Sequence, residues 1–277
     1  MLNSSYSRLK TYRPMENAEI ISRFPSVGSL SAHQDVSARY QVIPTIGILD
    51  MLKKEGWQTM QVKEVNARNA KVGFQKHMIR LQHVNSMSGS LSVGDEIMNA
   101  VLVNSHDRTC AYQFYTGIFR LVCANGLIVG NSQFERVSVR HVGFKPEDVI
   151  EASYKIINSA PEIMNNVKEM KQITLTDSEK TVYANAAMNL LYDETETPAI
   201  KPEKLLTVRR SNDRSPDLWR TFNTVQENIM QGGLRGYNQE KRRYVSTRKV
   251  NNIDKDVRLN RALWTLTEEM ANLKMAA

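Results

Sequence analysis

Residues 96–130 read EIMNAVLVNSHDRTCAYQFYTGIFRLVCANGLIVG, and they carry the clearest architectural signal in the chain. Apolar and polar residues partly alternate in this stretch, which is the period-2 pattern of half-buried β-strands. Short groups of turn-forming residues separate the alternating segments. Among them, Asn125–Gly126 favours a type I′ hairpin turn, because both central residues of that turn need positive φ. The stretch therefore predicts neighbouring antiparallel strands, with a plain tight turn and no ligand role as the simplest interpretation of that dipeptide.

The same alternation recurs on both sides of this stretch. WQTMQVKEV (57–65) and HMIRLQHV (77–84) precede it, and ERVSVRHV (135–142) follows it. The links between these segments are short and rich in turn-forming residues, so five or six strands are expected to pair as an antiparallel meander. Before the first strand, Pro44 opens a helical pattern that Gly56 ends.

Beyond Lys145 the apolar residues recur at helical spacing. Pro161 is expected to break or kink the first of these helices, and Thr176–Glu179 is a capping box that begins the second. Two more helices are expected, at 216–231 and 254–274, and the apolar face of the last one suits either its own core or a contact between subunits. The sequence thus predicts an α+β fold, with a central antiparallel β-meander sheet followed by packed helices.

The chain of 277 residues is long enough for one large domain or two modest ones. We expect a flexible lead-in over 1–34, an α+β core domain over 35–200, and a basic helical and loop region over 201–277 that packs on the core. Hydrophobic residues make up 41% of the chain and charged residues 24%, which is ordinary for a globular protein. No apolar run approaches the roughly 20 residues of a membrane helix, and no secretory leader is visible, so no membrane contact is expected.

The residue types that mark common catalytic and metal sites are scattered. The five histidines do not lie beside a cysteine at zinc-ligand spacing, and no phosphate-binding loop, G-x-G-x-x-G or G-x-S-x-G motif occurs. Asp254 and Asp256 stand at a helix start, where they complement the helix dipole. We therefore expect no enzyme, no catalytic residue, no cofactor and no metal. Cys110 and Cys123 suit a reducing, cytoplasmic setting, where we expect them to be buried, reduced and inert.

Positive charge is concentrated near the end of the chain. The net charge is +8, and residues 209–261 hold 13 lysines and arginines against 6 acidic residues. The densest part, GGLRGYNQEKRRYVSTRKV (232–250), combines glycine, basic residues and two tyrosines. Guanidinium groups on a flexible backbone can reach phosphates, and aromatic faces can stack on unpaired bases. The pattern favours single-stranded nucleic acid, and the alternatives are a solvated basic loop or a surface that docks on an acidic partner.

Basic and aromatic residues of this loop and of two other segments are the expected nucleic-acid contacts. Two of them, at positions 136 and 140, share one face of a strand, and cross-strand ion pairing is their alternative role. The expected set is Arg136, Arg140, Arg209, Arg210, Tyr237, Lys241, Arg242, Arg243, Tyr244, Arg248 and Lys249.

Several segments resemble a family found in phages, prophages and plasmids. The stretch FRLVCANGLIVGN (119–131), with the basic strand that ends at Arg140–His141, resembles the phage/plasmid-like domain of unknown function numbered 932. Three further segments fit the same family, and together they extend the resemblance over about 35–271. They are RYQVIPTIGILDMLKKEGW (39–57), RRYVSTRKV (242–250) and IDKDVRLNRALWTLTEEMA (253–271).

The resemblance implies a function only through a second likeness. A β-meander followed by a helix is similar to the β-β-β-α core of single-strand annealing proteins, which include phage Red-beta and eukaryotic Rad-type proteins. This likeness implies binding and annealing of single-stranded DNA without nucleotide hydrolysis, and assembly into a homo-oligomeric ring or filament in the cytoplasm of the host cell. The alternative is a non-enzymatic phage interaction protein whose basic face docks on an acidic host partner.

Overall fold

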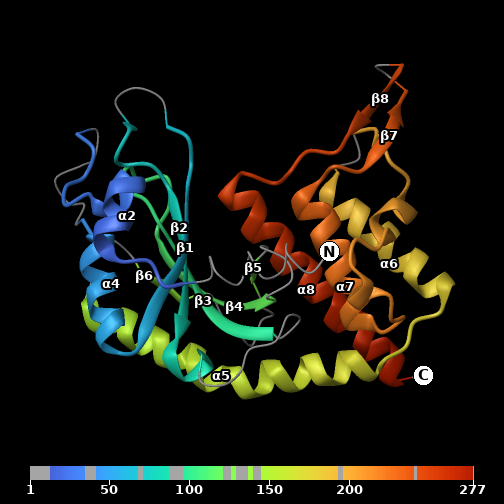
Figure 1. Cartoon of the computed structure of the whole chain (residues 1–277), viewed down its shortest axis with the longest axis horizontal. Coiled ribbons are helices and arrows are strands. Elements are labelled where there is room, and N and C mark those ends of the chain that lie inside the picture. Colours follow the sequence, from blue (N-terminus) through green and yellow to red (C-terminus); the bar gives the residue numbers. More distant parts are fainter. Residues whose placement is uncertain are drawn as a thin grey trace. The chain divides into compact units, whose positions relative to one another are not determined.

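The computed structural model describes residues 13–34, 42–67, 71–87, 96–120, 126–128, 137–139, 145–192, 196–239 and 242–276. The chain divides into two compact units, which we call unit 1 (Met1–Ala160) and unit 2 (Pro161–Ala277). Unit 1 holds an antiparallel sheet with helices, and unit 2 is mainly helical (Figure 1). The predicted α+β class, with a sheet followed by helices, is confirmed.

The sheet of unit 1 is the predicted antiparallel meander. Its four long strands pair in sequence order, and two short strands lie on the far side of the fourth. The strands are β1 (Trp57–Glu64), β2 (His77–His83), β3 (Glu96–Asn104), β4 (Tyr112–Arg120), β5 (Gly126–Ile128) and β6 (Val137–Val139). β5 pairs with the end of β4, but Gly126 lies inside β5 opposite Phe119, so the prediction of a two-residue turn centred on Asn125–Gly126 is wrong; residues 121–125 lie outside the described part.

The core of unit 1 lies between the sheet and its helices. β3 is buried on both faces, which explains why its residues 100–103 form a continuous apolar run instead of alternating. Helix α4 (Thr45–Lys54) packs Ile48, Leu49 and Leu52 into the same cluster as Leu81 of β2. α4 begins after Pro44 and ends before Gly56, whose φ of +87° suits a helix C-terminus, as predicted. A short 3-10 helix, η2 (Val84–Met87), follows β2.

The segment predicted to be a flexible lead-in over 1–34 contains two helices in its described residues. They are α2 (Asn17–Arg23) and α3 (Pro25–Gly28). Ile20 and Val27 are fully buried in the core of unit 1. The prediction is wrong for residues 13–34: Ile20, Phe24 and Val27 recur at helical spacing and all pack in the core, but the segment is short and mainly polar, which obscures this signal.

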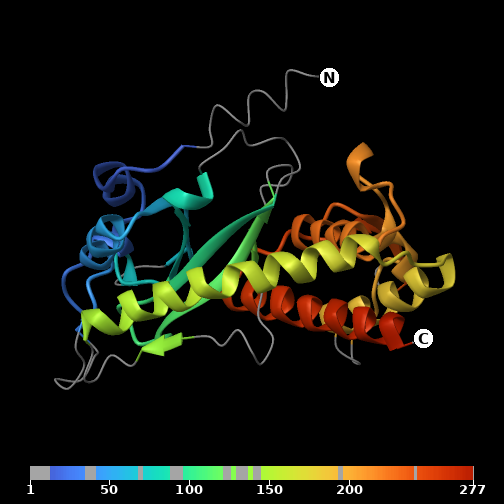
Figure 2. The same ribbon diagram turned by 90° about the horizontal axis from the view of Figure 1, so that it is seen from below.

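One long helix, α5 (Pro146–Gln172), follows the sheet. Pro161 lies inside it, and the helix continues past this residue without the predicted break (Figure 2). The proline instead falls where the chain passes from unit 1 to unit 2. In unit 1 the first half of α5 contributes Val149, Ala152 and Ile156 to the core.

In its described residues, unit 2 contains the second half of α5 and three further α-helices, joined by irregular segments. α7 (Leu218–Gln231) begins at the Asp217 cap, and its Trp219 and Phe222 stack with ring centroids 5.4 Å apart. The predicted capping box of Thr176 and Glu179 opens the first of these three further helices. The remaining elements are α6 (Asp177–Leu191), η3 (Pro202–Leu206), η4 (Ser211–Asp213), β7 (Arg235–Asn238), β8 (Arg243–Ser246) and α8 (Ile253–Ala276).

The boundary predicted at residue 200, between the core domain and the basic region, lies too far along the chain. The two units divide at Ala160, because α6 packs against η3, α7 and α8 and thus belongs to the second unit. Trp264 of α8 lies edge-on to Trp219, with centroids 6.4 Å apart, and is fully buried. The apolar face of α8 therefore serves the core of its own unit, while Leu273 near its end is 68% exposed.

Candidate nucleic-acid interface

The basic segment 232–250 contains a β-hairpin rather than the loop that its glycines suggest. β7 and β8 pair in antiparallel register, with Tyr237 opposite Tyr244 and Arg235 opposite Ser246 (Figure 1). Side chains at directly opposite positions share a face of a two-stranded sheet. Arg235, Tyr237, Tyr244 and Ser246 therefore lie on one face, and all four are exposed. We call this surface the tyrosine face.

Two glycines position the hairpin. Gly232 ends α7 with φ +62°, and a Cβ there would lie 2.5 Å from the backbone carbon of Arg248. A Cβ on Gly236 would lie 1.8 Å from the carbonyl oxygen of Ala199. Since atoms cannot approach so closely, only glycine fits either site. The contact with Ala199 occupies the face of β7 opposite the tyrosines and leaves the tyrosine face open to solvent.

The aromatic side chains of the tyrosine face contact one another without being buried. The rings of Tyr237 and Tyr244 meet edge to face, with centroids 5.4 Å apart, and are 48% and 64% exposed. The guanidinium carbon of Arg235 lies 5.1 Å from the centroid of Tyr244, within cation–π range. Such a cluster offers π surfaces and positive charge in one place, which is the combination that binds unpaired bases.

Four of the predicted cations lie close to the residues of the tyrosine face along the chain, and all four are exposed. Arg242 occupies the turn with a φ of +46°, Arg243 begins β8, and Arg248 and Lys249 follow it. Within the described residues, none of the four pairs with a carboxylate. Their positive charge is therefore available to phosphates. Lys241, Arg136 and Arg140 lie outside the described residues.

Arg209 and Arg210 have partners within unit 2, although Arg209 is itself exposed and Arg210 is half-buried. The Arg209 guanidinium donates to Oδ1 of Asn228 at 2.5 Å and to the carbonyl oxygen of Gly232. Arg210 forms an ion pair with Glu227 of α7, at 2.5 Å. Arg209 thus holds the glycine turn that begins the hairpin and is a positioning residue. A count of basic residues does not show whether an arginine already contacts an acceptor within the protein or is available to a nucleic acid.

Sequence reasoning missed Arg235, which is part of the tyrosine face. The signal was present in the spacing, because Arg235 and Tyr237 are two residues apart and thus share a face of any strand. It was hidden because Gly232, Gly233 and Gly236 lie within five residues of one another, and such a glycine-rich segment favours a loop over a strand.

A polar network in the core of unit 1 resembles a catalytic constellation and requires a separate explanation. Ser26 donates to Glu64 at 2.6 Å and lies 3.0 Å from Nδ1 of His77, while Oγ1 of Thr45 lies 2.9 Å from Nε2. Asn104 in turn donates to Thr45 at 2.9 Å. Ser26, His77 and Thr45 have no exposed surface, so no substrate reaches them.

The network is satisfied when His77 is neutral. Nδ1–H then donates toward Ser26 and the carbonyl oxygen of Gln75, while Nε2 accepts from Thr45. Burial, and next the nearby His106, lower the pKa of His77 to about 3. The arrangement joins α3, α4 and β2 through a polar core contact.

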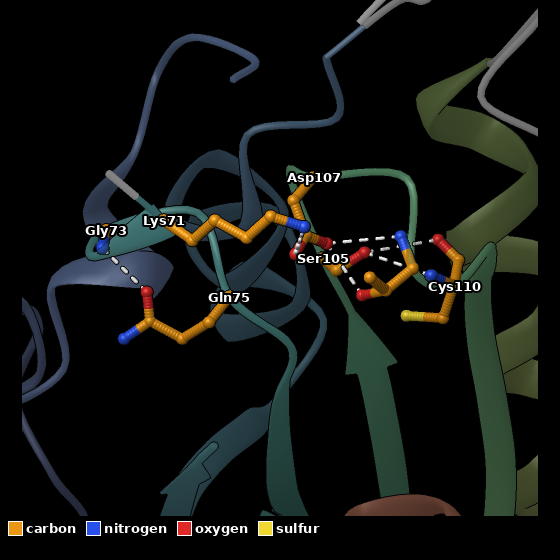
Figure 3. A network of polar contacts seen from close by, with 7 residues as sticks. Lys71, Gly73, Gln75, Ser105, Asp107 and Cys110 are labelled. Carbon is orange, nitrogen blue, oxygen red and sulfur yellow. Dashed lines mark hydrogen bonds and ion pairs between the residues drawn. The ribbon is translucent and has the colours of Figure 1, made fainter. Parts of the chain in front are cut away.

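A second polar cluster closes the link between β3 and β4 (Figure 3). Asp107 accepts from both the backbone and the hydroxyl of Thr109 and forms an ion pair with Lys71 at 3.8 Å. Ser105 and Cys110 exchange hydrogen bonds beside it. Burial raises the pKa of Asp107, but the hydrogen bonds of Thr109 and Ser105 and the charge of Lys71 outweigh it, so the net shift is downward. Cys110 is half-buried and not fully buried as expected, and Cys123 lies outside the described part.

The described residues contain no group of three or more histidine, cysteine or acidic side chains placed to hold a metal ion. None of their helices has both the length and the apolar character needed to cross a membrane.

Residues 32–264 match a family described as a domain of unknown function (DUF932). The chain belongs to the DUF932 family. The DUF932 match includes the whole meander and the β7–β8 hairpin, and it excludes α2 and α3, although both contribute to the core.

Two curated proteins of Escherichia coli (strain K12) are similar to this DUF932 chain over nearly its whole length. They are UPF0380 protein YafZ and UPF0380 protein YfjQ, each 36% identical over 259 residues. In both comparisons the aligned region covers 93% of this chain and 92% of the relative. No solved structure gives a significant match to the chain.

Proposed function

We propose that this DUF932 protein binds single-stranded DNA and that the tyrosine face of the β7–β8 hairpin is its contact surface. The observation that carries the proposal is the exposure of two tyrosines that contact each other, with Arg235 beside Tyr244, on a hairpin whose Gly236 lies against Ala199. Stacking of a base on an aromatic side chain contributes about 1–3 kcal/mol and needs an unpaired base. A single strand presents such bases and a duplex does not.

The cations around the hairpin supply the contacts to phosphate. Arg242, Arg243, Arg248 and Lys249 are exposed and free of ion pairs within the described residues, so binding to phosphate breaks no ion pair there. Each phosphate that they neutralise releases counterions, and the affinity therefore falls as salt is added.

The finer form of the proposal is strand annealing by a protein of a phage or other mobile element. The meander of β1–β4, followed by α5, is compatible with the β-β-β-α core of Red-beta and Rad-type annealing proteins. Annealing of this type needs no nucleotide hydrolysis, and it would take place in the cytoplasm of the host cell. The protein would assemble into a homo-oligomeric ring or filament, because each subunit covers only a few nucleotides.

The test of binding is a fluorescence-anisotropy titration with labelled single-stranded and duplex DNA at two salt concentrations. We expect tighter binding of the single strand and a loss of affinity at the higher salt concentration. Equal affinity for the two DNA forms, or no binding, would contradict the proposal. Displacement of the strand by polyglutamate, at matched charge, as effectively as by unlabelled DNA would favour the alternative, an acidic protein partner.

The test of annealing follows the pairing of two complementary labelled strands by energy transfer, without ATP. We expect the protein to accelerate pairing and to show an oligomeric mass by light scattering. A monomeric mass both with and without DNA would count against assembly.

A further inference from the structure

A pocket of about 540 Å³ lies within unit 2, beside the hairpin. Its walls come from the end of α6, the segment 196–200, α7, and the chain from β8 to the start of α8. Ile200, Leu205, Leu234 and Val250 give it a buried apolar floor, and the half-buried Tyr192 forms part of a wall. The volume lies in the range typical of small-molecule sites.

The rim of the pocket is polar and mainly basic. Among its described lining residues, Arg248, Lys249 and Lys255 carry positive charge, and Glu196 carries the one negative charge. Burial, and next the charge of Glu196, raise the pKa of Tyr192, so its phenol stays protonated and able to donate a hydrogen bond. An apolar floor below a cationic rim fits a ligand that has a flat apolar part and an anionic part.

The chain that carries the tyrosine face also lines the pocket. Tyr244 stands on β8, and the residues from Val245 to Asn252 follow it along the pocket wall. Four residues of extended chain, as from Tyr244 to Arg248, span at most about 14 Å. The pocket is thus within reach of a strand that is stacked on Tyr244.

We propose that this pocket is a nucleotide subsite, which takes one base on its apolar floor and the adjoining phosphate at Arg248, Lys249 and Lys255. The inference rests on the proposed function, because the nucleotide belongs to the strand held at the tyrosine face. A strand bound in this way stacks bases on the tyrosine face and inserts one base into the pocket beside the hairpin.

The test measures binding of isolated compounds by calorimetry: thymidine monophosphate, thymidine and inorganic phosphate. Thr197→Trp fills the pocket, since Thr197 lines it from an exposed irregular segment. Thr207→Trp is the matched control, because Thr207 is also exposed and does not line the pocket. We expect the monophosphate to bind more tightly than thymidine or phosphate. Thr197→Trp should lower the affinity for the monophosphate at least tenfold, and Thr207→Trp should leave this affinity unchanged. Melting curves verify that both variants fold.

A second variant measures the contribution of the phosphate to binding separately from that of the base. Lys255→Gln removes one rim cation. We expect it to lower the affinity for the monophosphate severalfold and to leave the affinity for thymidine unchanged. Inorganic phosphate that binds as tightly as the monophosphate, or a monophosphate that does not bind, would overturn the nucleotide subsite. If the wild type still binds single-stranded DNA in that case, the tyrosine face keeps its proposed role. An unchanged affinity of Thr197→Trp for single-stranded DNA would overturn the participation of the pocket in strand binding.

Discussion

The guanidinium carbon of Arg235 lies 5.1 Å from the centre of the Tyr244 ring, on a hairpin face where that ring is 64% exposed. This contact, together with the edge of Tyr237, orients the Tyr244 ring while it stays accessible. Ordering a side chain before its partner arrives reduces the entropic cost of binding. The tyrosine face is therefore preorganised for stacking.

Tyr244→Ala tests the stacking contribution. We expect single-strand affinity to fall by roughly 5- to 150-fold, which corresponds to about 1–3 kcal/mol, with little change in the dependence on salt. The melting temperature should barely change, because the ring contributes little to the core. Anisotropy titrations and melting curves measure both effects. Tyr154→Ala is the control, since Tyr154 is 47% exposed on α5. The same loss in both variants would refute a specific role for Tyr244.

Arg242→Ala combined with Arg243→Ala tests the phosphate contacts. Each lost contact lowers the slope of log affinity against log salt by roughly 0.7 for single strands, so the double variant should lose about 1.4. Adding Lys241→Ala should bring the loss to about two, if this third cation contacts phosphate as the sequence predicts. The control is Lys53→Ala with Lys155→Ala, which removes two exposed charges from unit 1. An unchanged slope in the hairpin variants would exclude the hairpin from the DNA site.

Arg209→Ala is expected to act on stability rather than on charge. Without the guanidinium, Asn228 and the carbonyl oxygen of Gly232 each lose a donor inside unit 2. Because Arg209 is itself exposed and water can replace its guanidinium, we expect a loss of only about 1 kcal/mol of unfolding free energy, which a urea titration resolves. Arg243→Ala, at an exposed site without an internal partner, should leave the urea midpoint unchanged. The opposite ranking of the two variants would show that the contacts of Arg209 do not stabilise unit 2.

The stability of unit 1 should depend on pH through His77. In the unfolded chain its pKa returns to about 6.5, and in the fold it is about 3, so between these values the unfolded state binds the extra proton. Stability should therefore fall as the pH drops from about 6.5 toward 3, with a slope of up to about 1.4 kcal/mol per pH unit. Urea titrations across this range measure the slope. His77→Gln should flatten it, and equal slopes in wild type and His77→Gln would contradict this assignment.

The sequence predicted those elements whose pattern is local. The alternation of residues 96–120 gave β3 and β4, and the Thr176–Glu179 box gave the start of α6, because period and capping depend on nearby residues. It failed where distant contacts decide. Ile20 and Val27 order a polar lead-in by packing on a remote core, and Pro161 stays helical within a long α5.

The basic composition of the sequence predicted the region of the candidate site, but which residues lie together there depends on the strand register of the hairpin. The excess of basic residues near Tyr237 and Tyr244 was evident, but the register that places Arg235 beside Tyr244 depends on hairpin pairing. The same excess included Arg209, whose partners lie inside unit 2. Charge alone does not reveal whether a basic side chain faces solvent or an internal acceptor.

Photocrosslinking tests the central claim, a single strand stacked on the tyrosine face, most directly. A single strand containing 5-iododeoxyuridine is irradiated in complex with the protein, and the crosslinked residues are identified by mass spectrometry. Because this base crosslinks efficiently to aromatic rings on which it stacks, we predict adducts at Tyr244 and Tyr237, and their loss in the variants Tyr244→Ala and Tyr237→Ala. Crosslinks confined to unit 1, with none in the peptide that spans β7 and β8, would contradict the account.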